Sequence, residues 1–235
     1  MEDIAMPRHL RLRLRLAIAG GKAVALAVCA GLVFIAGASF PISAPAATPG
    51  ESPAAAGVDR SSPDRMVRAA VEGVLATIQA NPDTRNGDLD KITAVVRQQF
   101  LPYTDFQRTT RLAVGSAWRS ATPEQQKQLY EQFQTLLVRS YALSLSQVRE
   151  QALKFRYKAP RTSGNDVVVE TSVLNKGDEV KIDYRLQRGA AGWSIYDINM
   201  SGAWLIEVYR RQFADIVAKG GIEGLVKYLA RHNAA

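Results

Sequence analysis

The chain has 235 residues, with 30 Lys and Arg against 22 Asp and Glu, a net charge of +8, one Cys and two His. Cys29 and His9 both lie within the first 46 residues, which leaves His232 as the only cysteine or histidine after them. This composition excludes a disulfide framework and most thiol, histidine and zinc chemistry in residues 47–235. The basic excess is spread out, without the interleaved basic and aromatic clusters of a nucleic-acid groove.

The N-terminus has the pattern of a signal peptide. Five basic residues precede an apolar run from Ala23 to Ala36, which is short for a membrane span and typical of the apolar core of an export signal. Small residues then allow cleavage after Ala38 or Ala46, so residues 1–46 are predicted to be removed. An uncleaved anchor, or a lipid attached to Cys29, are the alternatives to this interpretation.

A linker and a single domain are predicted to follow. Residues 47–61 are rich in Ala, Pro, Ser and Gly and are predicted to be a disordered linker, and residues 62–233 are predicted to be one domain. Apolar residues then recur at helical spacing, and the capping pattern Thr122-Pro123-Glu124-Gln125 opens the longest segment. Four helices are predicted in this half of the domain, at residues 62–81, 89–100, 104–114 and 123–151.

The second half of the domain changes to a period of two. Apolar and polar residues alternate in four segments, at residues 153–157, 167–173, 180–186 and 193–200. Such segments predict an antiparallel sheet with one apolar and one polar face. An apolar helix at 203–218, a stop at Gly220-Gly221 and a short helix at 223–230 complete the chain. The predicted class is α+β, with a helical layer packed on a curved antiparallel sheet of about four strands.

Three carboxylates on the predicted strands are the candidates for acid–base work. The alternation directs Asp183 and Glu170 to the polar face beside Lys181 and Arg185, where they are predicted to form a solvated charge lattice. Asp197 follows two aromatic residues, and a structural hydrogen bond is predicted for it. A glycine-rich stretch around Gly220 follows a helix and lacks the spacing of a phosphate loop, which indicates a helix end.

Four short motifs, in this order behind a signal peptide, carry a resemblance to a known family. They are Leu101-Pro102-Tyr103, then Ser120-Ala121-Thr122-Pro123-Glu124-Gln125, then Trp193 with Tyr196-Asp197, and finally Ile222-Glu223-Gly224-Leu225. The sequence resembles the MlaC/toluene-tolerance family of periplasmic phospholipid-binding proteins over about residues 63–233. The resemblance implies a helical layer against a twisted sheet, with a deep apolar cavity between them.

The resemblance also implies a function without catalysis. Members of the family bind a glycerophospholipid by its acyl chains and carry it between an outer-membrane lipoprotein complex and an inner-membrane ABC transporter. The expectation is therefore a monomeric periplasmic carrier that maintains outer-membrane asymmetry, with no cofactor, no metal and no nucleic-acid partner. The motifs leave the head group, the number of acyl chains, the direction of transport and the docking surface open. They also leave open another lipid cargo, such as a hopanoid.

The cavity follows from the physics of such a ligand. Each buried methylene contributes about 0.8 kcal/mol, so two acyl chains with about thirty methylenes represent about 20 kcal/mol and require an apolar container. We expect a volume at or above the upper end of the roughly 300–1,000 Å³ typical of ligand pockets. The predicted lining takes the apolar sheet face and the helices opposite it: Phe100, Leu112, Phe133, Leu137, Tyr141, Val167, Val169, Val173, Ile182, Tyr184, Trp204, Leu205 and Val208.

Two other classes of function remain as alternatives. An enzyme on a similar fold would need a buried acid–base pair, for which the sequence offers only carboxylates and tyrosines. An envelope adaptor would use the same apolar residues as an ordinary filled core and would bind partners through an exposed face. A large apolar cavity distinguishes the carrier from both.

Overall fold

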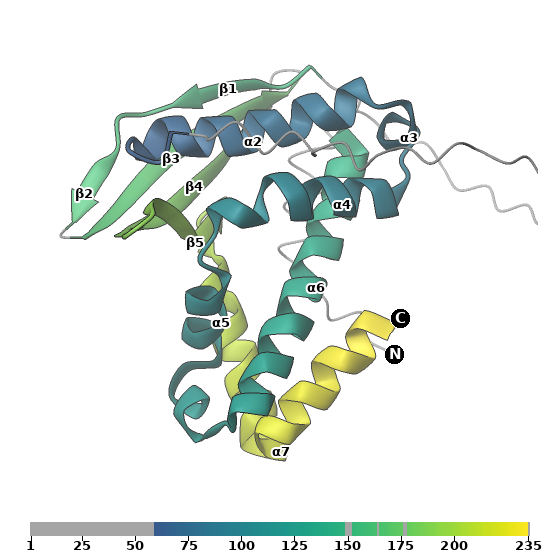
Figure 1. Cartoon of the computed structure of the whole chain (residues 1–235), viewed down its shortest axis with the longest axis vertical. Helices are drawn as coiled ribbons and strands as arrows, with labels where there is room; N and C mark the ends of the chain where they lie inside the picture. Colours follow the sequence, from purple (N-terminus) through teal and green to yellow (C-terminus); the bar gives the residue numbers. More distant parts are fainter. Residues whose placement is uncertain (1–58, 149–151, 164, 176–177, 235) are drawn as a thin grey trace, which may run out of the picture. The chain divides into compact units, whose positions relative to one another are not determined.

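The computed structural model describes residues 59–148, 152–163, 165–175 and 178–234, which form an α+β fold (Figure 1). The predicted signal peptide and nearly all of the predicted linker lie outside the described residues, as does the end of the helix predicted at 123–151. Within the described ranges, no helix has both the length and the hydropathy that crossing a bilayer requires.

The helices of the first half begin and end close to the predicted positions. They are α2 (Pro63–Ala80), α3 (Pro82–Arg85), α4 (Leu89–Gln99), α5 (Phe106–Val114) and α6 (Pro123–Val148), with short 3₁₀ turns η1 (Leu101–Tyr103) and η2 (Gly115–Ser120).

Side-chain caps account for these positions. The backbone N–H of Gln125 donates to Thr122 Oγ1 over 3.2 Å, and the Thr122 N–H donates to Gln125 Oε1 over 3.0 Å, which confirms the predicted capping box of α6. Asp105 caps α5 by accepting the Arg108 N–H over 2.9 Å. The three short elements, α3, η1 and η2, were not predicted because one or two turns carry too few residues for a periodic pattern.

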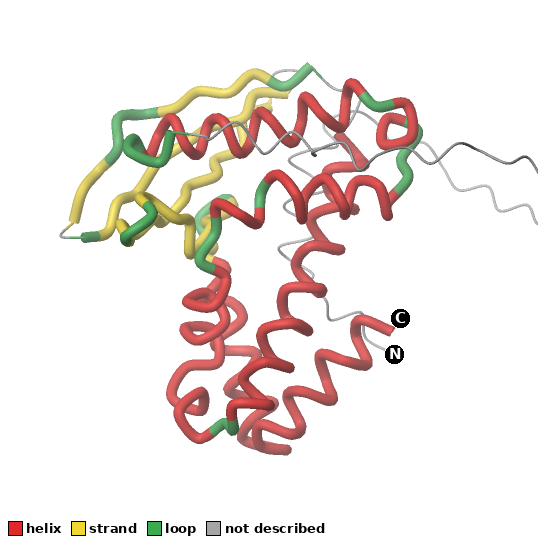
Figure 2. Tube along the Cα trace, in the orientation of Figure 1, coloured by secondary structure: helices red, strands yellow, loops and turns green. Residues whose placement is uncertain are grey.

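The strands form one antiparallel sheet of six strands, which appears as the yellow layer in Figure 2. They are β1 (Lys154–Tyr157), β2 (Arg161–Ser163), β3 (Asp166–Asn175), β4 (Asp178–Gly189), β5 (Gly192–Met200) and β6 (Ala203–Trp204). The order is β1-β3-β4-β5-β6. Strand β2 pairs with the first residues of β3, and β1 pairs with the later residues of the same strand. The four predicted strands are confirmed. The two extra strands have three and two residues, too few to show alternation.

The turn between β4 and β5 depends on one glycine. Gly192 has a φ of 95°, and a β-carbon added there would lie 2.7 Å from the β-carbon of Arg60. The next residue, Trp193, donates its backbone N–H to the Arg60 carbonyl over 3.1 Å. A residue without a side chain therefore lets the segment before α2 approach the sheet and bond to it.

The C-terminal helix differs from the prediction at its start and in its packing. Ala203 and Trp204 form strand β6, and α7 (Leu205–Ala234) begins directly after them. Gly221, with φ 64° and ψ −168°, breaks the helical path inside α7, as expected for a helix end at the glycine pair. We expected this helix to pack on the sheet. Its core residues instead join those of α5 and α6 in a separate helical group, visible in Figure 1.

Three hydrophobic clusters hold these elements together. The first joins α5, α6 and α7 around Phe133, whose ring centroid lies 4.9 Å from that of Tyr209 and 5.1 Å from that of Phe213. The second packs the N-terminal half of α2 on the sheet, and the third joins α2, α4 and α6. Because α6 contributes to the first and the third cluster, it connects the helical group to the helices that cover the sheet.

Candidate functional site

An apolar cavity lies between the sheet and the helices α2, α4 and α6. Its wall contains residues spaced three and four apart on α2 and residues spaced two apart on β4 and β5, as one helix face and one sheet face require. Its volume is about 180 Å³. The lining residues are Val71, Val74, Leu75, Val96, Phe100, Tyr141, Ser144, Leu145, Leu153, Phe155, Val173, Val180, Ile182, Tyr184, Ile198 and Met200.

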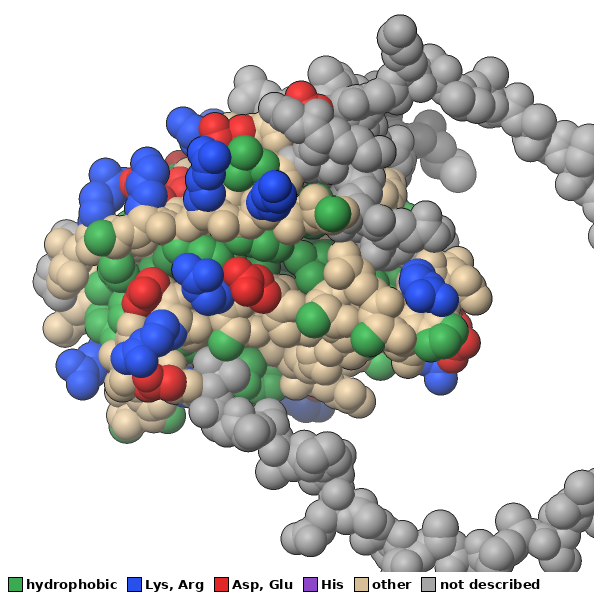
Figure 3. Space-filling model, turned by 90° about the horizontal axis from the view of Figure 1, so that it is seen from above, with side chains coloured by type: hydrophobic (Ala, Val, Ile, Leu, Met, Phe, Trp, Pro, Cys, Tyr) green, Lys and Arg blue, Asp and Glu red, His purple; other side chains and the backbone are tan. Residues whose placement is uncertain are grey.

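The cavity is smaller than the sequence argument predicted. A volume of about 180 Å³ is below the range expected for a ligand with two acyl chains. Figure 3 shows a recessed band of hydrophobic side chains, with charged side chains on both sides of it, on the face of the molecule that carries β1 and α2. These two elements also contribute Phe155, Val71 and Leu75 to the cavity wall.

The lining is almost free of polar groups. Ser144 donates its hydroxyl to the Ser140 carbonyl over 3.1 Å, and this bond leaves no free hydroxyl proton there. The other polar atoms belong to the phenols of Tyr141 and Tyr184, and the Tyr141 hydroxyl is buried without a hydrogen-bond partner in the described part of the chain. Burial raises the pKa of both phenols, so both are neutral at physiological pH. The cavity thus presents a neutral, apolar surface.

Five of the thirteen sequence-predicted lining residues lie on the cavity wall. They are Phe100, Tyr141, Val173, Ile182 and Tyr184. The structure places the other eight elsewhere in the domain. Val167 and Val169 are buried under the N-terminal half of α2, and Phe133, Leu137 and Leu205 belong to the helical cluster. Leu112, Trp204 and Val208 are half-buried outside the cavity wall. A role in binding remains a prediction for all thirteen.

Eleven lining residues were missed, and most of them carried a usable signal. Val180 alternates in phase with Ile182 and Tyr184, which were chosen on β4. Ile198 and Met200, like Leu153 and Phe155, lie two residues apart in predicted strands from which no residue was chosen. Val71, Val74 and Leu75 form the apolar stripe of α2, and its periodicity alone does not say whether it packs against the sheet or against another helix. The missing information was the pairing of helices with the sheet, which depends on tertiary packing.

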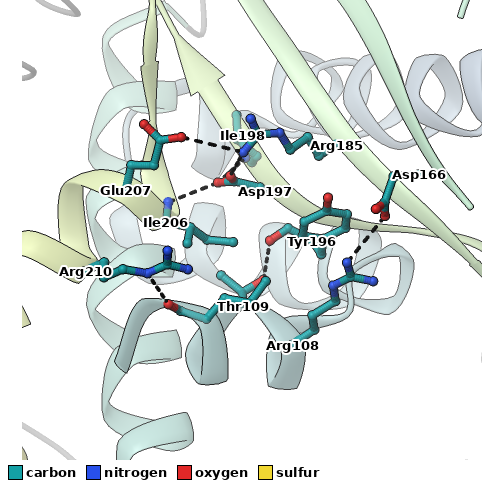
Figure 4. A network of polar contacts seen from close by, with 11 residues as sticks. Arg108, Thr109, Asp166, Arg185, Tyr196, Asp197, Ile198, Ile206, Glu207 and Arg210 are labelled. Carbon is teal, nitrogen blue, oxygen red and sulfur yellow. Dashed lines mark hydrogen bonds and ion pairs between the residues drawn. The ribbon is translucent and has the colours of Figure 1, made fainter. Parts of the chain in front are cut away.

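A polar network lies where the sheet meets α5 and α7 (Figure 4). The Asp197 side chain is fully buried, and its Oδ1 accepts the backbone N–H groups of Ile198 and Ile206, each over 3.0 Å. Its Oδ2 is 3.1 Å from Arg185 Nη1. Burial raises the pKa of this carboxyl, while the two N–H groups and Arg185 oppose the shift. Asp197 therefore holds the first turn of α7 on β5, which confirms the predicted structural hydrogen bond.

The same network attaches α5 to β5. Thr109 donates its hydroxyl to the Tyr196 carbonyl over 2.6 Å, and the Arg108 guanidinium lies 3.9 Å from the centre of the Tyr196 ring. Arg108 also pairs with Asp166 at 3.4 Å. These contacts join the helical group to the sheet through polar bonds, whereas the cavity is built from apolar contacts alone.

The outer face of the sheet carries charged pairs, but with other partners than predicted. Glu170 pairs with Lys158 at 2.9 Å and also with Arg161, whereas Arg185 pairs with Asp197. Glu170 lies directly across from Asp183 in the β3–β4 register. Partial burial raises the pKa of Asp183. These carboxylates are on the opposite face of β4 from Ile182 and Tyr184, so they do not face the cavity. No group of three or more potential metal-binding side chains occurs among the described residues.

Comparison with known proteins identifies the family. The family described as MlaC protein matches residues 68–231. The intermembrane phospholipid transport system binding protein MlaC of Haemophilus influenzae is 21% identical over 173 residues, which cover 72% of this chain and 81% of that protein. Toluene tolerance protein ttg2D of Pseudomonas putida is 22% identical over 166 residues, which cover 70% of this chain and 77% of that protein.

A solved structure extends this likeness to the fold. The phospholipid-binding protein of Ralstonia solanacearum, determined in complex with a phospholipid, superimposes with a TM-score of 0.70 at 45% sequence identity. The match covers 74% of this chain and 97% of that one. Because the family match spans most of the domain and the fold agrees with that of a closely similar chain, this protein belongs to the MlaC family.

Proposed function

We propose that this protein is a periplasmic carrier that binds a phospholipid by its acyl chains and passes it between the outer and inner membranes. The observation that carries the proposal is the neutral apolar cavity between α2 and the sheet, together with the apolar band on the face that carries β1 and α2. A relative with 45% identity was solved in complex with a phospholipid, which supports the same class of ligand here.

The physical chemistry of the site suits this ligand. Acyl chains gain about 0.8 kcal/mol for each methylene that leaves water, and they need no polar partner in return. A lining without charge provides such an environment, while the head group can remain in solvent. The lining also contains no carboxylate, lysine or histidine, so it offers binding rather than acid–base chemistry. We therefore favour a carrier over an enzyme.

The partners and the compartment follow from the proposal. A carrier with the predicted signal peptide would work in the periplasm, and its partners would be an outer-membrane lipoprotein complex and an inner-membrane ABC transporter. The Haemophilus influenzae relative is named as the binding protein of an intermembrane phospholipid transport system, which supports this assignment.

The proposal can be tested by filling the cavity. Ile182 lies on the cavity wall, and its neighbour Lys181 is exposed on the other face of the same strand. Native mass spectrometry of the purified protein should detect bound phospholipid in the wild type and in Lys181→Trp. In Ile182→Trp, the indole occupies the space of the acyl chains, and the bound lipid should be lost. Wild-type protein without stoichiometric phospholipid, or equal retention in both variants, would refute the proposed site.

A further inference from the structure

A charged and aromatic cluster lies beside the cavity at the boundary between α2 and β1. Its members are Arg68 and Glu72 on α2 and Tyr157 on β1, called here the rim cluster. The guanidinium carbon of Arg68 is 4.2 Å from the centre of the Tyr157 ring, so the cluster connects the helix to the edge strand. The Tyr157 ring in turn stacks on the ring of Phe155, a cavity-wall residue, at 6.2 Å between centroids and an interplanar angle of 24°.

The helical spacing also places the rim cluster at the cavity. Val71 on the cavity wall is three residues after Arg68 and one before Glu72, and Leu75 is three residues after Glu72. Residues three and four apart lie on the same side of a helix, so the charged pair borders the apolar stripe of α2. Figure 3 shows charged side chains along the apolar band, consistent with a polar border to an apolar site.

The two charges of the rim cluster are only weakly engaged with each other. Arg68 Nη1 is 3.8 Å from Glu72 Oε1, and the two side chains are 54% and 42% exposed. An arginine that precedes the glutamate by four residues is also the less favourable order for such a pair. By contrast, the nearby Arg65 pairs with Asp59 at 3.2 Å, and Lys158 pairs with Glu170 at 2.9 Å. Arg68 can therefore bind other groups at little cost. Glu72 also lies beside the Tyr157 phenol, whose pKa is raised by burial and by the Glu72 charge, so a ligand amine would share this carboxylate with the phenol.

The geometry of the rim cluster defines which groups fit. The Arg68 guanidinium carbon lies over the Tyr157 ring, and a guanidinium held in this way can offer N–H donors to a planar or tetrahedral oxyanion. Glu72, one helical turn away, provides an acceptor for a cationic amine. A phosphate joined to an amine by a short linker presents both charges together, as in the head group of a zwitterionic phospholipid.

We propose that the rim cluster is a head-group subsite that favours zwitterionic over anionic phospholipids, with Arg68 binding the phosphate, Glu72 binding the amine and the Tyr157 ring positioning Arg68. The inference rests on the proposed function, because the acyl chains must occupy the adjacent cavity for the head group to reach this border. An anionic lipid without an amine would leave Glu72 unpaired beside a second negative charge.

The test is a competition between lipids that share the same acyl chains. Protein purified from cells that express the full chain is delipidated and then incubated with vesicles of equimolar phosphatidylethanolamine and phosphatidylglycerol, and the bound ratio is read by mass spectrometry. Wild type should favour phosphatidylethanolamine. Glu72→Gln should shift the ratio toward phosphatidylglycerol by about threefold, the effect of one partly exposed charge. Arg68→Gln should reduce retention of both lipids, and Arg68→Lys should restore part of it.

Matched controls separate this inference from the proposed function. Lys127 and Glu131 form an exposed pair four residues apart on α6, at 3.5 Å, and Lys127→Gln and Glu131→Gln should leave the ratio unchanged. Inorganic phosphate in excess should also leave the ratio of bound phosphatidylethanolamine to phosphatidylglycerol unchanged. If excess phosphate abolishes the preference, Arg68 binds free anions and not the phosphate of the lipid. A Glu72→Gln ratio equal to that of the wild type would overturn the subsite. Wild type that loads neither lipid would refute the carrier function itself.

Discussion

Replacement of Asp197 tests how the helical group is attached to the sheet. In Asp197→Ala, the backbone N–H groups of Ile198 and Ile206 lose the carboxylate oxygen that accepts both of them. An unsatisfied buried donor costs about 1–3 kcal/mol, so the free energy of unfolding should fall by about 2–6 kcal/mol. Arg185 also loses the nearer of its two acidic partners, but its side chain is 33% exposed and can be solvated.

Asp197→Asn should have a much smaller effect. The amide oxygen can accept the same two N–H groups, and burial raises the pKa of Asp197, which means that the negative charge is itself costly in the folded state. We expect a loss below about 1.5 kcal/mol. Glu207, the exposed second partner of Arg185 at 3.9 Å, provides the control, since Glu207→Ala should cost less than about 1 kcal/mol.

Urea unfolding followed by circular dichroism measures all three variants on one scale. Equal losses in Asp197→Ala and Asp197→Asn would show that the charge, and not the shared acceptor oxygen, stabilises this junction. A loss below about 1 kcal/mol in Asp197→Ala would refute the claim that Asp197 secures the start of α7.

Three further predictions concern local structure and pH. Gly192→Ala should destabilise the fold by more than about 1 kcal/mol, because its φ is 95° and the added carbon would meet Arg60 in the segment before α2. Gly73→Ala, in a helix with open space around the new carbon, should stabilise it by about 0.5–1 kcal/mol, and thermal unfolding that gives both variants the same sign would contradict the argument. Thr122→Ala should cost about 1 kcal/mol in urea unfolding through loss of the α6 cap, and an unchanged midpoint would show that the cap is redundant. Since burial raises the pKa of Asp197 above its ordinary 3.8, the folded state holds a proton that the unfolded chain releases, and this contribution to stability should be lost as pH rises from 3.8 through the folded-state pKa. Asp197→Asn should remove that part of the pH dependence, which urea titrations at several pH values would measure.

Local signals were sufficient to predict most elements of the fold. The capping box at Thr122 and Gln125 and the acidic cap at Asp105 act within one helical turn, so they can be read directly from neighbouring residues. The alternation along β4 likewise identified the face that contains Ile182 and Tyr184. These features are encoded over three to five residues, and the structure agrees with them.

The packing partner of each helix could not be predicted in the same way. Helix α6 has 26 residues and spans about 39 Å, so different parts of its apolar stripe can meet different partners. Phe133 and Leu137 therefore join the helical cluster, while Tyr141 and Leu145, further along the same stripe, reach the cavity. One continuous apolar stripe therefore packs partly in the helical cluster and partly in the cavity wall. Only the tertiary structure shows where along α6 the helical cluster ends.

The absence of charge from the cavity wall determines how the affinity would differ between lipids with different acyl chains. A wall that makes only apolar contacts cannot distinguish one acyl chain from another by chemical group, so it discriminates by length. Each additional methylene that fits adds about 0.8 kcal/mol, or about a fourfold gain in affinity, until the space is filled. Beyond that length the extra carbons stay in water and the gain stops. The described wall would therefore measure fatty-acid length, with a plateau set by the extent of its apolar lining.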